Sequence, residues 1–151
     1  MPCALQLIKR KWQGGDEFCK LCGKIESTDH ALFKCPLAVF TWCVVRDALG
    51  LTNSPTNIRD CLRLKPGKNV QGVWVMFFAS VCWVIWLVRN DWVFSNILVK
   101  SPLQVAYKAM SFVQRWCIML KEGDQAAMKG WGDLLMAKLQ QLKPCCLPAS
   151  V

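Results

Sequence analysis

Residues 69–88 contain no charged side chain, and any fold of this chain has to bury them. The most apolar part, Val73–Val88, is sixteen residues long and has Ser80 as its one polar residue. As a helix it would span about 24 Å, less than the ~30 Å hydrocarbon core of a bilayer. A helix that is apolar on every side can also form the centre of a bundle. We therefore expect a buried central helix, with a single membrane span as the alternative.

The composition is that of a folded protein. Of 151 residues, 54% are hydrophobic and 19% are charged, which argues against an intrinsically disordered chain. The length fits one domain, or a small module joined to a larger one. The formal net charge of +9 favours an anionic partner without identifying it.

Turn and capping residues divide the chain into predicted helices. Gly50 is a natural helix stop, and Ser54-Pro55 and Ser101-Pro102 each resemble an N-cap followed by a first helical residue. The predicted helices are 36–49, 55–64, 70–94, 103–120 and 133–142. In the fourth, the residues expected on one apolar face are Leu103, Tyr107, Met110, Val113, Cys117 and Leu120. In the last, the apolar residues are Leu134, Leu135, Leu139 and Leu142.

Four residues near the N-terminus have the spacing of a metal site, Cys19-x2-Cys22-x7-His30-x4-Cys35. Tetrahedral Zn²⁺ binds thiolate and imidazole ligands, and two cysteines separated by two residues can reach one ion from a tight turn. Gly23 suits such a turn, because the backbone there often needs a positive φ. Four protein ligands leave no open coordination position, so the sequence predicts a structural rather than a catalytic Zn²⁺ site.

The ten cysteines could instead form a secreted disulfide framework. No signal peptide is evident, because Met1–Leu7 is followed at once by Lys9-Arg10-Lys11, the reverse of the signal-peptide order. We therefore expect reduced cysteines and a nuclear or cytoplasmic location, with disulfides or a thioredoxin-like redox pair as alternatives. Cys145 and Cys146 are assigned no role.

Two groups of basic residues are candidate phosphate contacts for RNA or DNA, and a solvated surface explains them equally well. The first group is Lys9, Arg10 and Lys11, and the second is Arg59, Arg63, Lys65 and Lys68.

Several runs of the sequence form a larger pattern when they are taken in order. They are Leu7–Gly14, Cys19–Gly23, Glu26–Ala38 with Trp42, and Trp83–Phe94, which carries a Trp-x-x-Arg-Asn motif. Together they resemble the zinc-binding domain of plant non-LTR (LINE-type) retrotransposon reverse transcriptases. The resemblance covers about residues 7–120. It implies that the cysteines and histidine of the spaced motif bind the metal ion.

The resemblance also implies a detached piece of a retroelement polyprotein that normally follows the polymerase. This sequence has no Asp-Asp pair to hold catalytic magnesium ions, so we expect no enzymatic activity. The implied partners are RNA or DNA, or the polymerase part of such a protein. Phe33, Phe40 and Trp42 are expected in the core rather than stacked on bases. Arg89 is expected in a cation–π contact or a contact with helix-end carbonyls.

The fold expected is mainly α, with a small N-terminal zinc-binding turn or hairpin module that leads into a helical bundle. The expected division is 1–48 for the module and first helix, 49–143 for the helical body, and 144–151 for a disordered tail. The predicted function is that of a structural zinc-binding domain fragment of a reverse transcriptase. The alternatives are a protein-interaction domain that docked on the polymerase, or a small single-span membrane protein.

Overall fold

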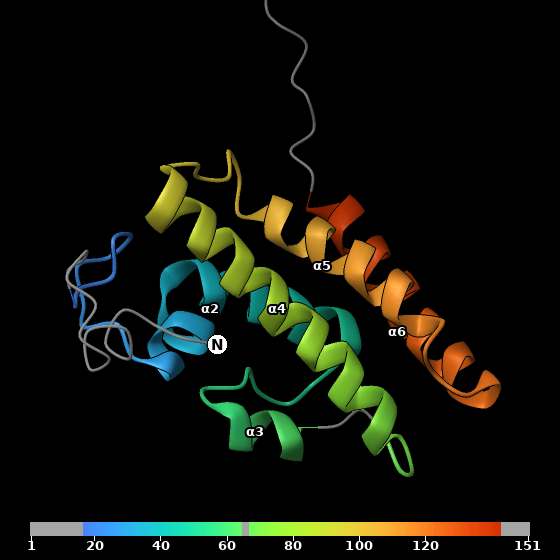
Figure 1. The fold of residues 1–151 in the computed structure, drawn as a ribbon. Helices are drawn as coiled ribbons and strands as arrows, with labels where there is room; N and C mark the ends of the chain where they lie inside the picture. The colour runs from blue at the N-terminus through green and yellow to red at the C-terminus, as the bar shows by residue number, and fades with distance from the viewer. Residues whose placement is uncertain (1–16, 65–66, 143–151) are drawn as a thin grey trace, which may run out of the picture.

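A computed structural model of the chain describes residues 17–64 and 67–142. The predictions that lie outside these ranges are those for Lys9, Arg10, Lys11, Lys65, Cys145, Cys146 and the tail 144–151. Within the described ranges the protein is mainly α-helical and has no β-strand, which confirms the predicted fold class. The elements that follow are labelled as in Figure 1.

Two helices lie where the sequence predicts them. Helix α2 (Pro36–Leu49) has Pro36 at its first position and ends at Gly50, which adopts the left-handed conformation with φ 63°. Helix α4 (Gln71–Ser95) ends at Asn96, which is also left-handed with φ 54°. Asn tolerates this conformation better than most residues with a side chain. The end of α2 confirms the stop predicted at Gly50.

Helix α3 (Ile58–Arg63) is shorter than predicted. Asn57, rather than Ser54, is its N-cap, and the Asn57 side-chain oxygen accepts a hydrogen bond from the Asp60 backbone amide at 2.9 Å. The prediction of a helical start at Pro55 is therefore wrong. A Ser-Pro pair fits a turn as well as a helix start.

Helix α5 (Leu103–Cys117) begins as predicted, and the Ser101 hydroxyl accepts a hydrogen bond from the Leu103 amide at 3.3 Å. Its buried face is rotated from the predicted one. Met110 and Val113 are buried as expected, whereas the other members of the predicted face are only half-buried. The remaining buried positions are Val105, Ala106 and Ala109.

Helix α6 (Glu122–Gln141) begins eleven residues before the predicted start at 133. Glu122 and Asp124 lie in its first turn, where the positive end of the helix dipole interacts favourably with acidic side chains. Leu135 and Leu139 are buried as predicted, but Leu134 is 51% exposed. The core-facing stripe instead extends back to Met128 and Trp131.

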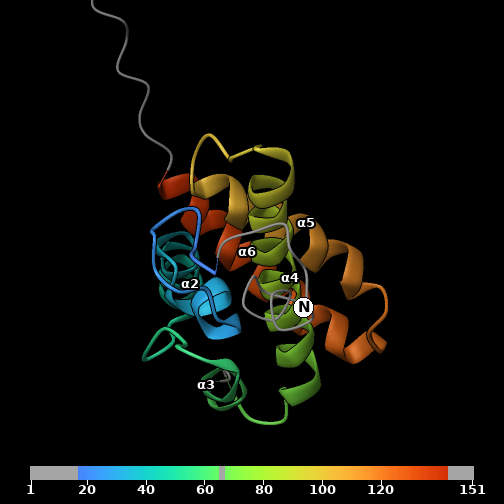
Figure 2. The ribbon, with the colours of Figure 1, turned by 60° about the vertical axis from the view of Figure 1, so that its left-hand side comes forward.

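Helix α4 is the centre of the bundle (Figures 1 and 2). It packs against α5, α6, α3 and the short π-helical turn η1 (His30–Lys34), while α2 packs against α6, η1 and α5. Among the described residues α4 is the one helix long and apolar enough to cross a membrane, with a mean hydropathy of 1.9 in its most apolar window. Of that window, 56% is buried inside the bundle. In this fold α4 is a core helix.

Aromatic side chains join the N-terminal elements to α4. The rings of Phe33 in η1, Trp42 in α2 and Phe78 in α4 lie 5.7 to 6.3 Å apart between centroids. Phe33 and Trp42 are almost fully buried, which confirms the prediction that these two rings are core residues. Phe40 is half-buried and packs against the core.

Candidate metal centre

A tight hairpin carries the first two predicted ligands. Phe18 and Ile25 form an isolated antiparallel bridge, the Cys19 amide donates to the Lys24 carbonyl at 2.6 Å, and the Gly23 amide donates to the Cys19 carbonyl at 2.8 Å. Gly23 has φ 72°, so the turn uses the conformation for which glycine was expected there. The backbone therefore turns back within five residues, and Cys19 and Cys22 come from the same turn.

The other two predicted ligands lie at the two ends of the π-helical turn η1: His30 is its first residue and Cys35 follows its last. The Cys35 amide donates to the His30 carbonyl at 2.7 Å. This bond joins residues five apart in the sequence, as in a π-helix, whereas an α-helical bond joins residues four apart. In an ordinary α-helix, residues five apart point about 140° away from each other around the axis. The wider π turn brings them nearer to the same side. Ser27 supports the start of this turn, because its hydroxyl accepts a hydrogen bond from the His30 amide at 3.1 Å.

The four predicted ligands converge. Their ligand atoms all lie within 4.8 Å of one another. The Cys19 and Cys35 sulfurs are 3.8 Å apart, and the Cys22 sulfur is 3.3 Å from His30 Nε2. Two thiolates bound at about 2.3 Å to a tetrahedral Zn²⁺ would be about 3.8 Å apart, and a thiolate and an imidazole nitrogen about 3.5 Å. The group could hold a metal ion.

The electrostatics of the two facing sulfurs also favour a cation. The hydrogen bond with Cys35 lowers the pKa of Cys19 to about 4. The same hydrogen bond and then burial raise the pKa of Cys35. The first proton therefore leaves easily, and the second is held in the buried hydrogen bond between the two sulfurs. A divalent cation between them would allow both sulfurs to be ionised at once.

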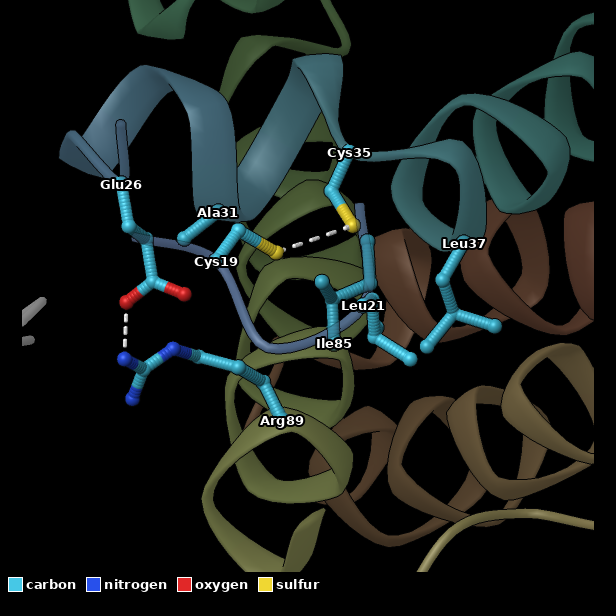
Figure 3. Close-up of a pocket in the computed structure, with 8 residues that line it drawn as sticks. All are labelled: Cys19, Leu21, Glu26, Ala31, Cys35, Leu37, Ile85 and Arg89. Carbon is cyan, nitrogen blue, oxygen red and sulfur yellow. Dashed lines mark hydrogen bonds and ion pairs between the residues drawn. The ribbon is translucent and has the colours of Figure 1, made fainter. Parts of the chain in front are cut away.

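A buried ion pair lies beside the cluster. The guanidinium of Arg89, in α4, donates to the Glu26 carboxylate, and the two side chains are 6% and 1% exposed. Figure 3 shows the pair next to the facing sulfurs of Cys19 and Cys35. Arg89 Nη1 also donates to the Asn90 side chain at 3.0 Å. The structure therefore gives Arg89 partners other than the aromatic ring or helix-end carbonyls expected from the sequence.

Lys20 makes a second link between the hairpin and α4. Its ammonium group donates to the Trp92 carbonyl at 3.3 Å and to the Asn96 side chain, and lies 4.7 Å from the centroid of the Trp92 ring. A cation at the C-terminal end of a helix is favoured by the helix dipole. Lys20 and Glu26 were not identified from the sequence, because no spacing rule connects them with residues in α4.

The described basic residues of the predicted phosphate-binding group are all exposed. Arg59 and Arg63 are one turn apart on α3, and Lys68 follows in the connection to α4. None of the three belongs to the metal cluster. Comparisons with protein-family models, with characterised proteins and with solved structures gave no significant match.

Proposed function

We propose that this chain is a non-catalytic helical domain organised by one structural Zn²⁺ ion, which is held by Cys19, Cys22, His30 and Cys35. The observation that carries the proposal is the convergence of these four ligand atoms within 4.8 Å. Three of the four are sulfurs, and thiolate-rich tetrahedral sets are typical of structural zinc sites.

The ion would act as a cross-link. It would join the hairpin to the turn η1, and through Cys35 it would reach the N-cap of α2. The direction in which α2 leaves the metal site would then be fixed by coordination as well as by packing. Because all four positions would be protein ligands, no site is left for a substrate or for a reactive water molecule.

Metal analysis of the purified protein tests this directly. We expect about one equivalent of zinc per chain, and removal with a strong chelator should lower the midpoint of thermal unfolding. In Cys22→Ser the zinc content should fall well below half an equivalent, because one thiolate ligand is lost. The matched control is Cys43→Ser, which changes a half-buried cysteine outside the cluster and should keep the metal. A wild-type protein without zinc, or an unchanged zinc content in Cys22→Ser, would contradict the proposal.

A retroelement origin and a role next to the polymerase stay predictions that rest on the sequence resemblance. A nuclear or cytoplasmic location stays a prediction that rests on the N-terminal sequence and on the expectation of reduced cysteines. RNA or DNA as a partner rests on the resemblance and on the net charge of +9. In this part of the proposal the domain supports the binding of nucleic acid by a larger protein.

A further inference from the structure

The ion pair between Glu26 and Arg89 joins two parts of the chain that are 63 residues apart. Glu26 belongs to the hairpin, and its amide donates to the Glu17 carbonyl at 2.8 Å. Its position is therefore set by the same backbone that presents Cys19 and Cys22. Arg89 belongs to the C-terminal half of α4, the central helix of the bundle.

The pair and the metal ligands also border the same space. A cavity of about 10 Å³ is lined by Cys19, Cys35, Glu26 and Arg89, together with four apolar residues (Figure 3). A buried charge that loses its partner is strongly destabilising, so the pair tolerates little displacement of the hairpin. The hairpin that carries Cys19 contacts Arg89 through Glu26.

We propose that the pair of Glu26 and Arg89 is a latch that couples metal binding to the C-terminal half of α4, with Lys20 as a second, exposed tie. The inference rests on the proposed zinc site. With the metal bound, the hairpin holds Glu26 against Arg89 and Lys20 against the end of α4. Without it, the thiolates no longer share a cation, the hairpin loosens, and both ties to α4 weaken.

The coupling has to act in both directions. A metal ion that favours the docked hairpin is in turn bound more tightly when the hairpin is docked. Arg89 is then a positioning residue for the metal centre that touches no ligand atom of the ion. Loss of an interaction that orients metal ligands typically lowers metal affinity by about 10- to 100-fold.

Amide hydrogen exchange with and without zinc, measured by mass spectrometry, tests the latch. In the wild-type chain zinc should slow exchange by about tenfold or more in the hairpin and η1, and also in α4 from about Trp86 to Ser95. In Glu26→Gln/Arg89→Gln the buried charges are removed as a pair, so neither is left alone. Zinc should still protect the hairpin, but its effect on α4 around Arg89 should be lost, and what remains should be confined to the last turn, which Lys20 contacts. Arg46→Gln/Asp47→Asn removes an exposed ion pair of equal charge on α2 and should behave like the wild type.

Lys20→Met is a second variant that leaves the core untouched, since Lys20 is exposed. It should reduce the zinc effect in the last turn of α4 while the hairpin stays protected.

The outcomes separate the two proposals. If zinc protects no part of the chain, the structural zinc site fails and the latch fails with it. If zinc protects the hairpin but leaves α4 of the wild type unchanged, the latch alone is overturned. Zinc-dependent protection around Arg89 that persists in the paired Gln variant also overturns the latch, and protection of the last turn of α4 that persists in Lys20→Met overturns the role of Lys20. The latch is also overturned if the variants lose protection equally throughout the bundle, both with and without zinc, because such a loss indicates a general loss of stability.

Discussion

Trp42 connects the candidate metal centre to the interior of the bundle. Its indole Nε1 donates to the Leu32 carbonyl, inside the turn η1, at 2.8 Å, and the side chain has no exposed surface. Its ring stacks on Phe33, which lies between the ligands His30 and Cys35. The position of η1 therefore depends on this one side chain as well as on the ligands.

We expect Trp42→Phe to lower the free energy of unfolding by about 2–4 kcal/mol, because it leaves a cavity and deprives a buried carbonyl of its donor. Urea unfolding of the zinc-loaded protein measures this. Trp116→Phe is the control, since that ring is half-buried and its change should stay below about 1 kcal/mol. A similar effect of both substitutions would show that the Trp42 hydrogen bond and burial have no special role.

At the scale of residues, the spacing of the motif predicts that Cys19, Cys22, His30 and Cys35 come together, as they do, whereas nothing in the sequence predicts the ion pair. The ligands lie within a short segment, so their spacing alone limits which turns can bring them together. Arg89 and Glu26 meet only after the whole bundle has formed. Each looks like an ordinary charged residue in the sequence, and no local pattern identifies its partner.

Among the helices, α6 differs most from its predicted extent. It contains Gly123, Gly130 and Gly132, and glycine lowers helix propensity by about 1 kcal/mol per residue relative to alanine. At Gly132, close packing against α5 offsets this cost. A Cβ on Gly132 would lie 3.2 Å from Met110 Cε, so the glycine permits close approach of α5 and α6. The end of α2 was predictable because Gly50 is a local signal.

Gly130 and Gly132 should respond in opposite ways to a side chain. Gly130→Ala should raise the free energy of unfolding by about 0.5–1 kcal/mol. A Cβ there meets nothing within 4 Å, and alanine lowers the conformational entropy of the unfolded chain. Gly132→Leu should lower it by about 1–3 kcal/mol, because the larger side chain meets Met110 and Val113. Thermal unfolding of the two variants measures both effects. A gain in stability from Gly132→Leu would contradict the packing described for α5 and α6.

The whole molecule carries a net charge of +9, and this charge, together with the sequence resemblance, is the basis for expecting a nucleic-acid partner. Arg59, Arg63 and Lys68 concentrate three exposed cations on and just after α3. They lie outside the metal cluster, so substituting them leaves the proposed zinc site intact.

We expect binding to single-stranded RNA to weaken as salt rises, and the triple variant Arg59→Gln/Arg63→Gln/Lys68→Gln to bind more weakly. Each lost phosphate contact should reduce the slope of log affinity against log salt by about 0.7. The control is Lys108→Gln/Lys121→Gln/Lys129→Gln, which removes the same charge from exposed positions on and between α5 and α6. Fluorescence anisotropy at several salt concentrations measures both. Equal losses in the two variants, or binding insensitive to salt, would contradict a specific role for the α3 cations.

The 63-residue separation of Glu26 and Arg89 also sets an order of events during synthesis. At about 5–20 residues per second, a ribosome adds the arginine roughly 3 to 13 s after the glutamate. The emerging hairpin therefore spends that time with its carboxylate in water, while its cysteines are already available to capture an ion. Metal acquisition can come first, and the nascent chain completes the buried pair only once the central helix has been made.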